Sequence, residues 1–124
     1  MAKKKRKKPN YDVDAHMLDF SVSIIDIVEA LPNTRSGNHI ARKLVRFGTG
    51  ALPYYSQGQH ADSKKEFIQK MGAALKQLRE TKVWLEVIYH KKLVECAKEL
   101  RMLLKDCNEL ISILTEKVEN TSKV

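Results

Sequence analysis

The stretch LVECAKELRMLLKDCNELISILTEKV, residues 93–118, carries apolar residues at intervals of three and four. The repeating positions are Leu93, Cys96, Leu100, Leu103, Cys107, Leu110, Leu114 and Val118. In a helix this spacing places all of them on one face, which needs a second apolar face to cover it. The stretch therefore predicts one helix of a bundle, from about Lys92 to Glu119. The turn before it, Tyr89 to Lys92, contains no Gly or Pro, so a helix unbroken through that turn is the alternative.

Three further segments have the same helical spacing, and the chain shows no sustained alternation between apolar and polar residues of the kind that predicts a strand. They run from about Asp14 to Leu31, from about Ser36 to Gln57, and from Ser63 to about Tyr89. Four amphipathic helices joined by short loops predict an all-α fold, an antiparallel up-down four-helix bundle over residues 11–120. Residues 1–10 are expected to form a disordered basic tail.

Local signals mark where helices begin and end. Asp12 or Asp14 is a candidate cap for the first helix. Ser63 and Glu66 have the spacing of a capping box, in which Ser63 accepts from the N–H of Glu66 and the Glu66 side chain reaches back to the N–H of Ser63. Pro53 lies near the end of the second segment and predicts a kink or an early end there.

The formal charge of +8 is concentrated at the N-terminus. Six consecutive basic residues stand there, namely Lys3, Lys4, Lys5, Arg6, Lys7 and Lys8, and they leave 17 basic and 15 acidic residues in the rest of the chain. The run permits three interpretations: a nucleic-acid-binding arm, a nuclear-import signal, or a tail that only aids solubility. We favour a polyanion partner, and we place the run among the candidate nucleic-acid-binding residues.

The sequence indicates a cytoplasmic protein without a membrane segment. The basic run is followed by Pro9, Asn10 and Tyr11 rather than by the ~7–15 apolar residues of a secretory signal, and no uncharged run approaches the ~18 residues of a membrane helix. Cys96 and Cys107 would lie ~16 Å apart along one helix, too far to bridge each other. Both are expected to be reduced and to act as small core hydrophobes.

No group of residues has the pattern of a catalytic or metal centre. The histidines occur singly, and neither cysteine has a flanking ligand at zinc-site spacing. Ordinary surface or partly buried side chains are the expectation for His16, His39, His60, His90, Cys96 and Cys107. The sequence therefore predicts no enzyme activity, no catalytic residue, no cofactor and no metal site.

A basic stripe is predicted on the second helix. Arg35, His39, Arg42 and Arg46 fall within ~60° of one another, with Lys43 beside them and the apolar stripe ~130° away. No acidic residue occurs between residues 29 and 62. We take Arg35, Arg42, Lys43 and Arg46 as candidate nucleic-acid contacts, and the alternative is a solvated face balanced by the acidic first helix.

The third helix carries a second apolar patch. At a rotation of ~100° per residue, the side chains of Val83, Trp84 and Val87 point 100° or more away from the core stripe. One bundle core cannot bury both of these helix faces. An exposed Trp flanked by valines predicts a subunit interface. The alternative is that Trp84 is buried inside the monomer.

Three stretches resemble a known family: SKKEFIQKM at residues 63–71, ETKVWLEV at 80–87 and LLKDCNEL at 103–110. In order and spacing they are similar to the bacterial four-helix bundle proteins named for intervening sequences of large-subunit ribosomal RNA. A more distant resemblance is to the accessory protein of diversity-generating retroelements, a basic pentamer that works with a reverse transcriptase. The resemblance implies a homopentamer. This chain departs from the family at Tyr54 and Gln57, where an Asn and a Glu are usual, so the role of that pair does not carry over.

These observations lead to one functional hypothesis and one rival. The hypothesis is a non-enzymatic RNA- or DNA-binding bundle, an accessory subunit of a nucleic-acid enzyme such as a reverse transcriptase or of a ribonucleoprotein. The rival is an oligomeric protein–protein scaffold with a basic solubility tail. The dependence of binding on salt separates the two, because phosphate contacts weaken steeply as salt rises.

Overall fold

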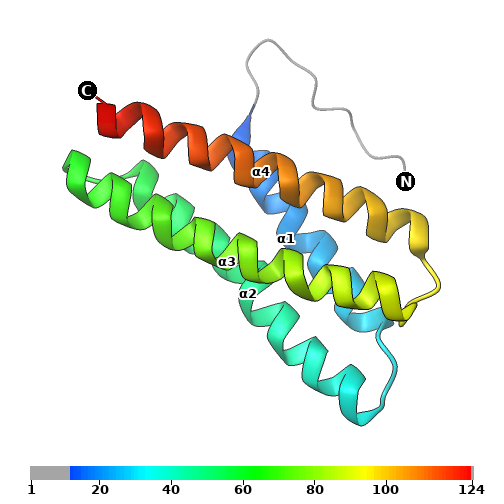
Figure 1. Cartoon of the computed structure of the whole chain (residues 1–124). Coiled ribbons are helices and arrows are strands. Elements are labelled where there is room, and N and C mark those ends of the chain that lie inside the picture. Colours follow the sequence, from blue (N-terminus) through cyan, green and yellow to red (C-terminus); the bar gives the residue numbers. More distant parts are fainter. Residues whose placement is uncertain (1–11, 124) are drawn as a thin grey trace.

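The computed structural model describes residues 12–123, which form four helices (Figure 1). They are α1 (Val13–Ala30), α2 (Arg35–Gln59), α3 (Lys64–Lys91) and α4 (Ala97–Lys123), and the described part of the chain contains no strand. Each helix packs against its neighbours in the chain, and α1 also packs against α4. The predicted all-α up-down four-helix bundle is confirmed. The basic run Lys3–Lys8 lies outside the described residues.

The apolar stripes predicted from the sequence build the core. Side chains at helical spacing from all four helices are buried, among them Met17, Phe20, Ile24, Ile27, Ile40, Leu44, Ala51, Tyr55, Met71, Ala74, Leu78, Leu85, Ile88, Leu100, Leu103, Cys107, Leu110 and Leu114. Each fully buried large apolar side chain contributes roughly 1.5–3 kcal/mol relative to exposure to water. Packing of these stripes, rather than intrinsic helix propensity, therefore stabilises the fold.

Side chains cap the helices where the sequence indicated. Asp12, rather than Asp14, caps α1 by accepting a backbone N–H of the first turn at 3.2 Å. Ser63 caps α3 and accepts from the N–H of Glu66 at 3.0 Å. The reciprocal bond differs from the expectation, because the Glu66 carboxylate accepts from the N–H of Asp62 at 3.2 Å instead of from Ser63. The side chain of Glu66 therefore bonds to the residue before the cap, Asp62, and not to the cap residue Ser63.

The expected early end of the second helix at Pro53 is wrong. Helix α2 continues through Pro53 to Gln59. Beyond the proline, Tyr55 and Gly58 are buried against the core. Packing of this last stretch offsets the loss of one backbone hydrogen bond at the proline.

The boundary between the third and fourth helices lies later than expected. Helix α3 ends at Lys91, its C-cap Lys92 adopts the left-handed conformation with φ 55° and ψ 49°, and α4 begins only at Ala97. The N–H of Leu93 bonds to the carbonyl of Ile88 at 3.1 Å and closes the helix end. Leu93 and Cys96 therefore precede α4 instead of belonging to it, and the unbroken helix is excluded. A lysine does what a glycine usually does at such a position.

Gly48 sets the distance between α1 and α2. A Cβ atom at this position would lie 2.6 Å from Cγ2 and 2.9 Å from Cγ1 of Ile24, which is fully buried. These atoms are attached directly to the Ile24 Cβ, so they cannot swing away without repacking the core. Only glycine permits the observed approach of the two helices.

Gly48→Ala is expected to lower the free energy of unfolding by up to about 2 kcal/mol, because overpacking costs ~1–3 kcal/mol and helix propensity returns up to ~1 kcal/mol. Gly72→Ala is the matched control, since nothing lies within 4 Å of its added Cβ. It should raise stability by ~0.5–1 kcal/mol. Urea denaturation of the wild type and both variants measures the difference. Equal effects of the two substitutions would contradict the close α1–α2 contact.

Candidate nucleic-acid interface and assembly surfaces

The basic stripe of α2 lies on its outer face. Arg35, His39, Arg42 and Arg46 are exposed and Lys43 is half-buried. Within residues 12–123 no carboxylate forms an ion pair with any of the four cations of this stripe. Helix α1 is acidic and contains no Lys or Arg. Its acidic residues nevertheless do not neutralise the basic stripe of α2 by direct contact.

The geometry of the stripe suits contact with phosphate groups. Its side chains recur at one-turn intervals along α2, so their charges follow a line on the surface. The Arg46 guanidinium lies over the ring of Phe47, 5.3 Å from its centroid, which restricts its position. A guanidinium can donate two parallel hydrogen bonds to a phosphate, and the ammonium of Lys43 acts as a compact point charge.

The apolar patch of α3 divides into an exposed and a half-buried part. Val83 is 53% exposed and Val87 38%. Trp84 is half-buried, because its ring meets the His39 ring edge to face at a centroid distance of 5.8 Å. The Trp84 Nε1–H donates to Glu80 at 3.3 Å. Val83 and Val87 thus face solvent as an interface requires, whereas Trp84 lies between α3 and α2.

A shallow hollow runs along the same part of α3. It is lined by Val83, Glu86, Val87, His90 and Lys91. Because these residues all come from one helix, the hollow can receive side chains of a partner but does not enclose a small molecule.

A second exposed apolar surface, on α1, was not predicted. Leu18, Val22 and Ile25 are 53%, 54% and 40% exposed. They recur at i, i+4 and i+7 on the side of α1 opposite to the core, next to the acidic Asp26 and Glu29. The spacing was visible in the sequence, but the core stripe alone already satisfied the pattern of an amphipathic helix. We call these three residues the α1 outer stripe.

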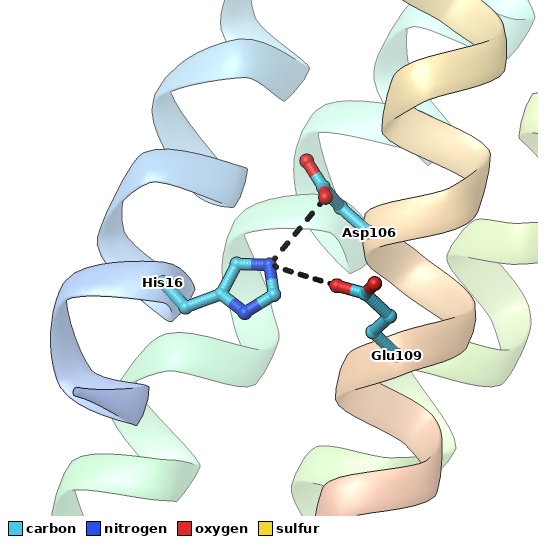
Figure 2. A network of polar contacts seen from close by, with 3 residues as sticks. All are labelled: His16, Asp106 and Glu109. Carbon is cyan, nitrogen blue, oxygen red and sulfur yellow. Dashed lines mark ion pairs between the residues drawn. The ribbon is translucent and has the colours of Figure 1, made fainter. Parts of the chain in front are cut away.

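The structure brings together three residues that the sequence left scattered (Figure 2). Nε2 of His16 on α1 lies 3.6 Å from a carboxylate oxygen of Asp106 and 4.0 Å from one of Glu109, both on α4. His16 is only 3% exposed. The expectation of a surface or partly buried histidine is therefore wrong for His16, because one end of its ring faces the carboxylates while the rest packs in the bundle.

The two cysteines differ in environment and neither belongs to a metal or catalytic cluster in the described residues. Cys107 is fully buried and its Sγ lies 3.4 Å from the carbonyl of Leu78, to which it donates. Burial raises the pKa of Cys107 to about 12, against the opposing effect of Lys82. Cys96 is half-buried in the segment before α4. Both thiols are free, as expected from the sequence.

The pair that departs from the family pattern lies near the end of α2. Tyr54 is half-buried and Gln57 is exposed. The neighbouring Tyr55 is buried, and burial together with the Asp14 carboxylate raises its pKa above the usual range. Tyr55, rather than Tyr54, therefore joins α2 to the core.

The fold defines the class of protein: a small all-α protein built as one up-down four-helix bundle, with exposed charged and apolar groups on its outer helix faces. The chain belongs to the 23S rRNA-intervening sequence protein family, whose family model matches residues 10–116. This match confirms the family resemblance inferred from the sequence.

A solved structure has the same fold. It is a protein of unknown function from the S23 ribosomal protein family of Bacteroides thetaiotaomicron, with a TM-score of 0.78 and 24% sequence identity. The similarity covers 86% of this chain and 98% of that one. No curated protein matches the chain. Within the described residues, no helix combines the length and the apolar character needed to cross a membrane.

The two thiols should differ in reactivity toward maleimide at pH 8. Cys96 is expected to react in the native protein, whereas Cys107 reacts only after unfolding, because a thiol with a pKa of about 12 holds almost no thiolate and is buried. Mass spectrometry of labelled native and urea-unfolded protein measures this. In the Cys96→Ser variant native labelling should be nearly abolished. Rapid native labelling of that variant would show that Cys107 is accessible.

Proposed function

We propose that this protein is a non-enzymatic nucleic-acid-binding bundle that acts as a homopentamer. The observation that carries the proposal is the exposed basic stripe of α2, which has no acidic partner within residues 12–123. Unneutralised cations in a row attract phosphates and release the counterions condensed on a nucleic acid. RNA and single-stranded DNA both present such phosphates.

Two further facts support this proposal. The run Lys3–Lys8 adds six cations to the chain immediately before the bundle. The name of the family contains 23S rRNA, and the Bacteroides relative is named as a member of the S23 ribosomal protein family. These names connect relatives of this chain with ribosomal RNA or the ribosome. By resemblance, the protein would serve in the cytoplasm as an accessory subunit of a reverse transcriptase or of a ribonucleoprotein.

The two exposed apolar surfaces support self-assembly. The α1 outer stripe has acidic neighbours, and the α3 patch of Val83, Trp84 and Val87 adjoins the basic side of α2 through the contact between Trp84 and His39. Two different patches of complementary chemistry on one chain favour a head-to-tail contact, in which the α1 outer stripe of one copy packs on the α3 patch of the next. Such a contact closes into a ring when the rotation per subunit allows it.

The rival is a protein–protein scaffold, favoured by the same exposed apolar surfaces. In that case the basic stripe contacts a neighbouring copy and the N-terminal run aids solubility. A scaffold would bind its partner through apolar contacts and show little dependence on salt. Nucleic-acid binding would show a steep one.

The first test is a salt titration of RNA and single-stranded DNA binding. Removing residues 1–9 should flatten the slope of log affinity against log salt by up to about four units, at ~0.7 per phosphate neutralised. Changing Arg42, Lys43 and Arg46 together to Gln should flatten it by about two units. Both variants should keep their fold, because residues 1–9 precede α1 in the chain and the α2 changes lie on its outer face, where Arg42 and Arg46 are exposed and Lys43 is half-buried.

A matched control removes three cations from another helix. Lys98, Arg101 and Lys105 are exposed on α4, and changing them together to Gln should leave the slope close to the wild type. Undetectable wild-type binding at low salt would favour the scaffold. If the α2 variant instead loses its oligomeric state, the stripe is part of the subunit interface.

The second test concerns the head-to-tail contact. Val22→Glu damages the α1 outer stripe and Val83→Glu damages the α3 patch, so each variant alone should sediment as a monomer where the wild type is a pentamer. Mixed in equal amounts, the two variants keep one intact patch of each kind and should form a one-to-one dimer that grows no further. Analytical ultracentrifugation measures these species.

Ser112→Glu, on an exposed position of α4, is the control and should assemble like the wild type. A wild-type monomer at tens of micromolar would contradict self-assembly, because specific interfaces are normally occupied at that concentration. A mixture of variants that stays monomeric would contradict the head-to-tail arrangement while leaving nucleic-acid binding unaffected.

A further inference from the structure

The cluster of His16, Asp106 and Glu109 joins the two helices at the ends of the chain (Figure 2). One nitrogen of His16 and one oxygen from each carboxylate all lie within 4.8 Å of one another. The side chains of Asp106 and Glu109 are 38% and 50% exposed, whereas that of His16 is 4% exposed. The cluster is therefore closed on the histidine side and open to solvent on the carboxylate side.

The helices hold these groups in place. Asp106 and Glu109 are three residues apart on α4, which puts their carboxylates on the same face of that helix. His16 lies in the first turns of α1 and its Nε2 points toward α4 (Figure 2). Among the four helix pairs that pack together, α1 and α4 have the least extensive contact.

We propose that His16, Asp106 and Glu109 bind one divalent transition-metal ion of the Zn²⁺ type, which links α1 to α4. The donor set is one imidazole nitrogen and two carboxylate oxygens. Ions of borderline softness such as Zn²⁺ and Co²⁺ accept both donor types, whereas Mg²⁺ and Ca²⁺ favour oxygen ligands alone. A water molecule can complete the coordination from the open side.

The distances allow this with small movements. Zinc bonds to nitrogen and oxygen are ~2.0–2.2 Å long, which places neighbouring ligands of a tetrahedral ion about 3.3–3.6 Å apart. The observed separations of 3.6 Å and 4.0 Å from Nε2 lie at or just above that range. The carboxylates of Asp106 and Glu109 can shorten these distances by rotating toward His16, because they are partly exposed and their movement does not disturb the core.

Metal binding at this site should be coupled to folding. The ligands come from the first and last helices of the chain and meet only when the chain is folded, so the ion binds the native state and not the unfolded one. An ion also offsets the repulsion between the two adjacent carboxylates. A plain ion pair between a protonated His16 and these carboxylates would need no metal, and the experiment separates the two cases.

The experiment uses the full chain, stripped of metal with EDTA and dialysed. Zn²⁺ is titrated by calorimetry, Co²⁺ by visible absorption, and the thermal midpoint is measured with and without Zn²⁺. We expect one ion to bind per chain and the bound Co²⁺ to show the visible absorption of a site with a low coordination number. At a free Zn²⁺ concentration of about 100 times the dissociation constant, the thermal midpoint should rise by about 5–10 °C. Mg²⁺ should give no comparable shift.

Three ligand variants and two controls assign the site. His16→Gln, Asp106→Asn and Glu109→Gln should each weaken Zn²⁺ binding at least ~10-fold. His90→Gln and Glu99→Gln change exposed residues of the same types on α3 and α4 and should bind like the wild type. Should His16→Gln fail to fold, the two carboxylate variants, whose side chains are partly exposed, still decide the question.

Several outcomes would overturn the proposal. Absence of saturable binding, or binding that the three ligand variants leave unchanged, would mean that the cluster is an ion pair only. Equal losses in the control variants would mean that the ion binds surface histidines and carboxylates without a defined site. None of these outcomes depends on whether the protein binds nucleic acid or forms a ring.

Discussion

Coverage of the apolar face of α3 is the constraint on which the rest of the bundle depends. This helix packs against both α2 and α4, and Met71, Leu78, Leu85 and Ile88 along it are fully buried. One helix cannot cover so wide a face, so α2 and α4 must both lie beside it, and α1 closes the remaining side (Figure 1). The buried Thr81 hydroxyl donates to the carbonyl of Gln77 at 2.7 Å within α3. This polar group on the buried face is therefore satisfied without a partner from a neighbouring helix.

Because the buried residues are apolar apart from His16, Ser21 and Thr81, most groups available for recognition lie on the outer faces and at the seam between α1 and α4. The outer face of α2 is basic, and α1 is acidic with an apolar outer stripe of Leu18, Val22 and Ile25. These faces belong to the two helices that meet across Gly48 and Ile24, so opposite charges lie on neighbouring elements of one small domain. A ring built from such copies would repeat the basic stripe at every subunit, which increases the attraction for a polyanion without adding contacts within one chain.

Much of the fold could be predicted from the sequence, because helices depend on local spacing. The stripe through Leu100, Leu103 and Leu110 identified α4, and the Ser63 cap identified the start of α3 to within one residue. The basic stripe of α2 was also predictable, since the side of a helix on which a residue lies follows from its number. The family motifs were recognisable for the same reason: they are short, continuous stretches.

The sequence by itself therefore determined which residues form helices and which faces are apolar or charged, whereas the tertiary structure decided how those faces meet. Nothing near Lys92 marked the end of α3, because a lysine adopts the left-handed conformation only when packing of the following segment favours it. Leu18, Val22 and Ile25 of the α1 outer stripe could equally have been core residues, since the spacing gives the side of a helix on which a residue lies but not what covers that side. The meeting of His16 with Asp106 and Glu109 is a contact between the first and last helices, and only the closing of the bundle places them within reach of one ion.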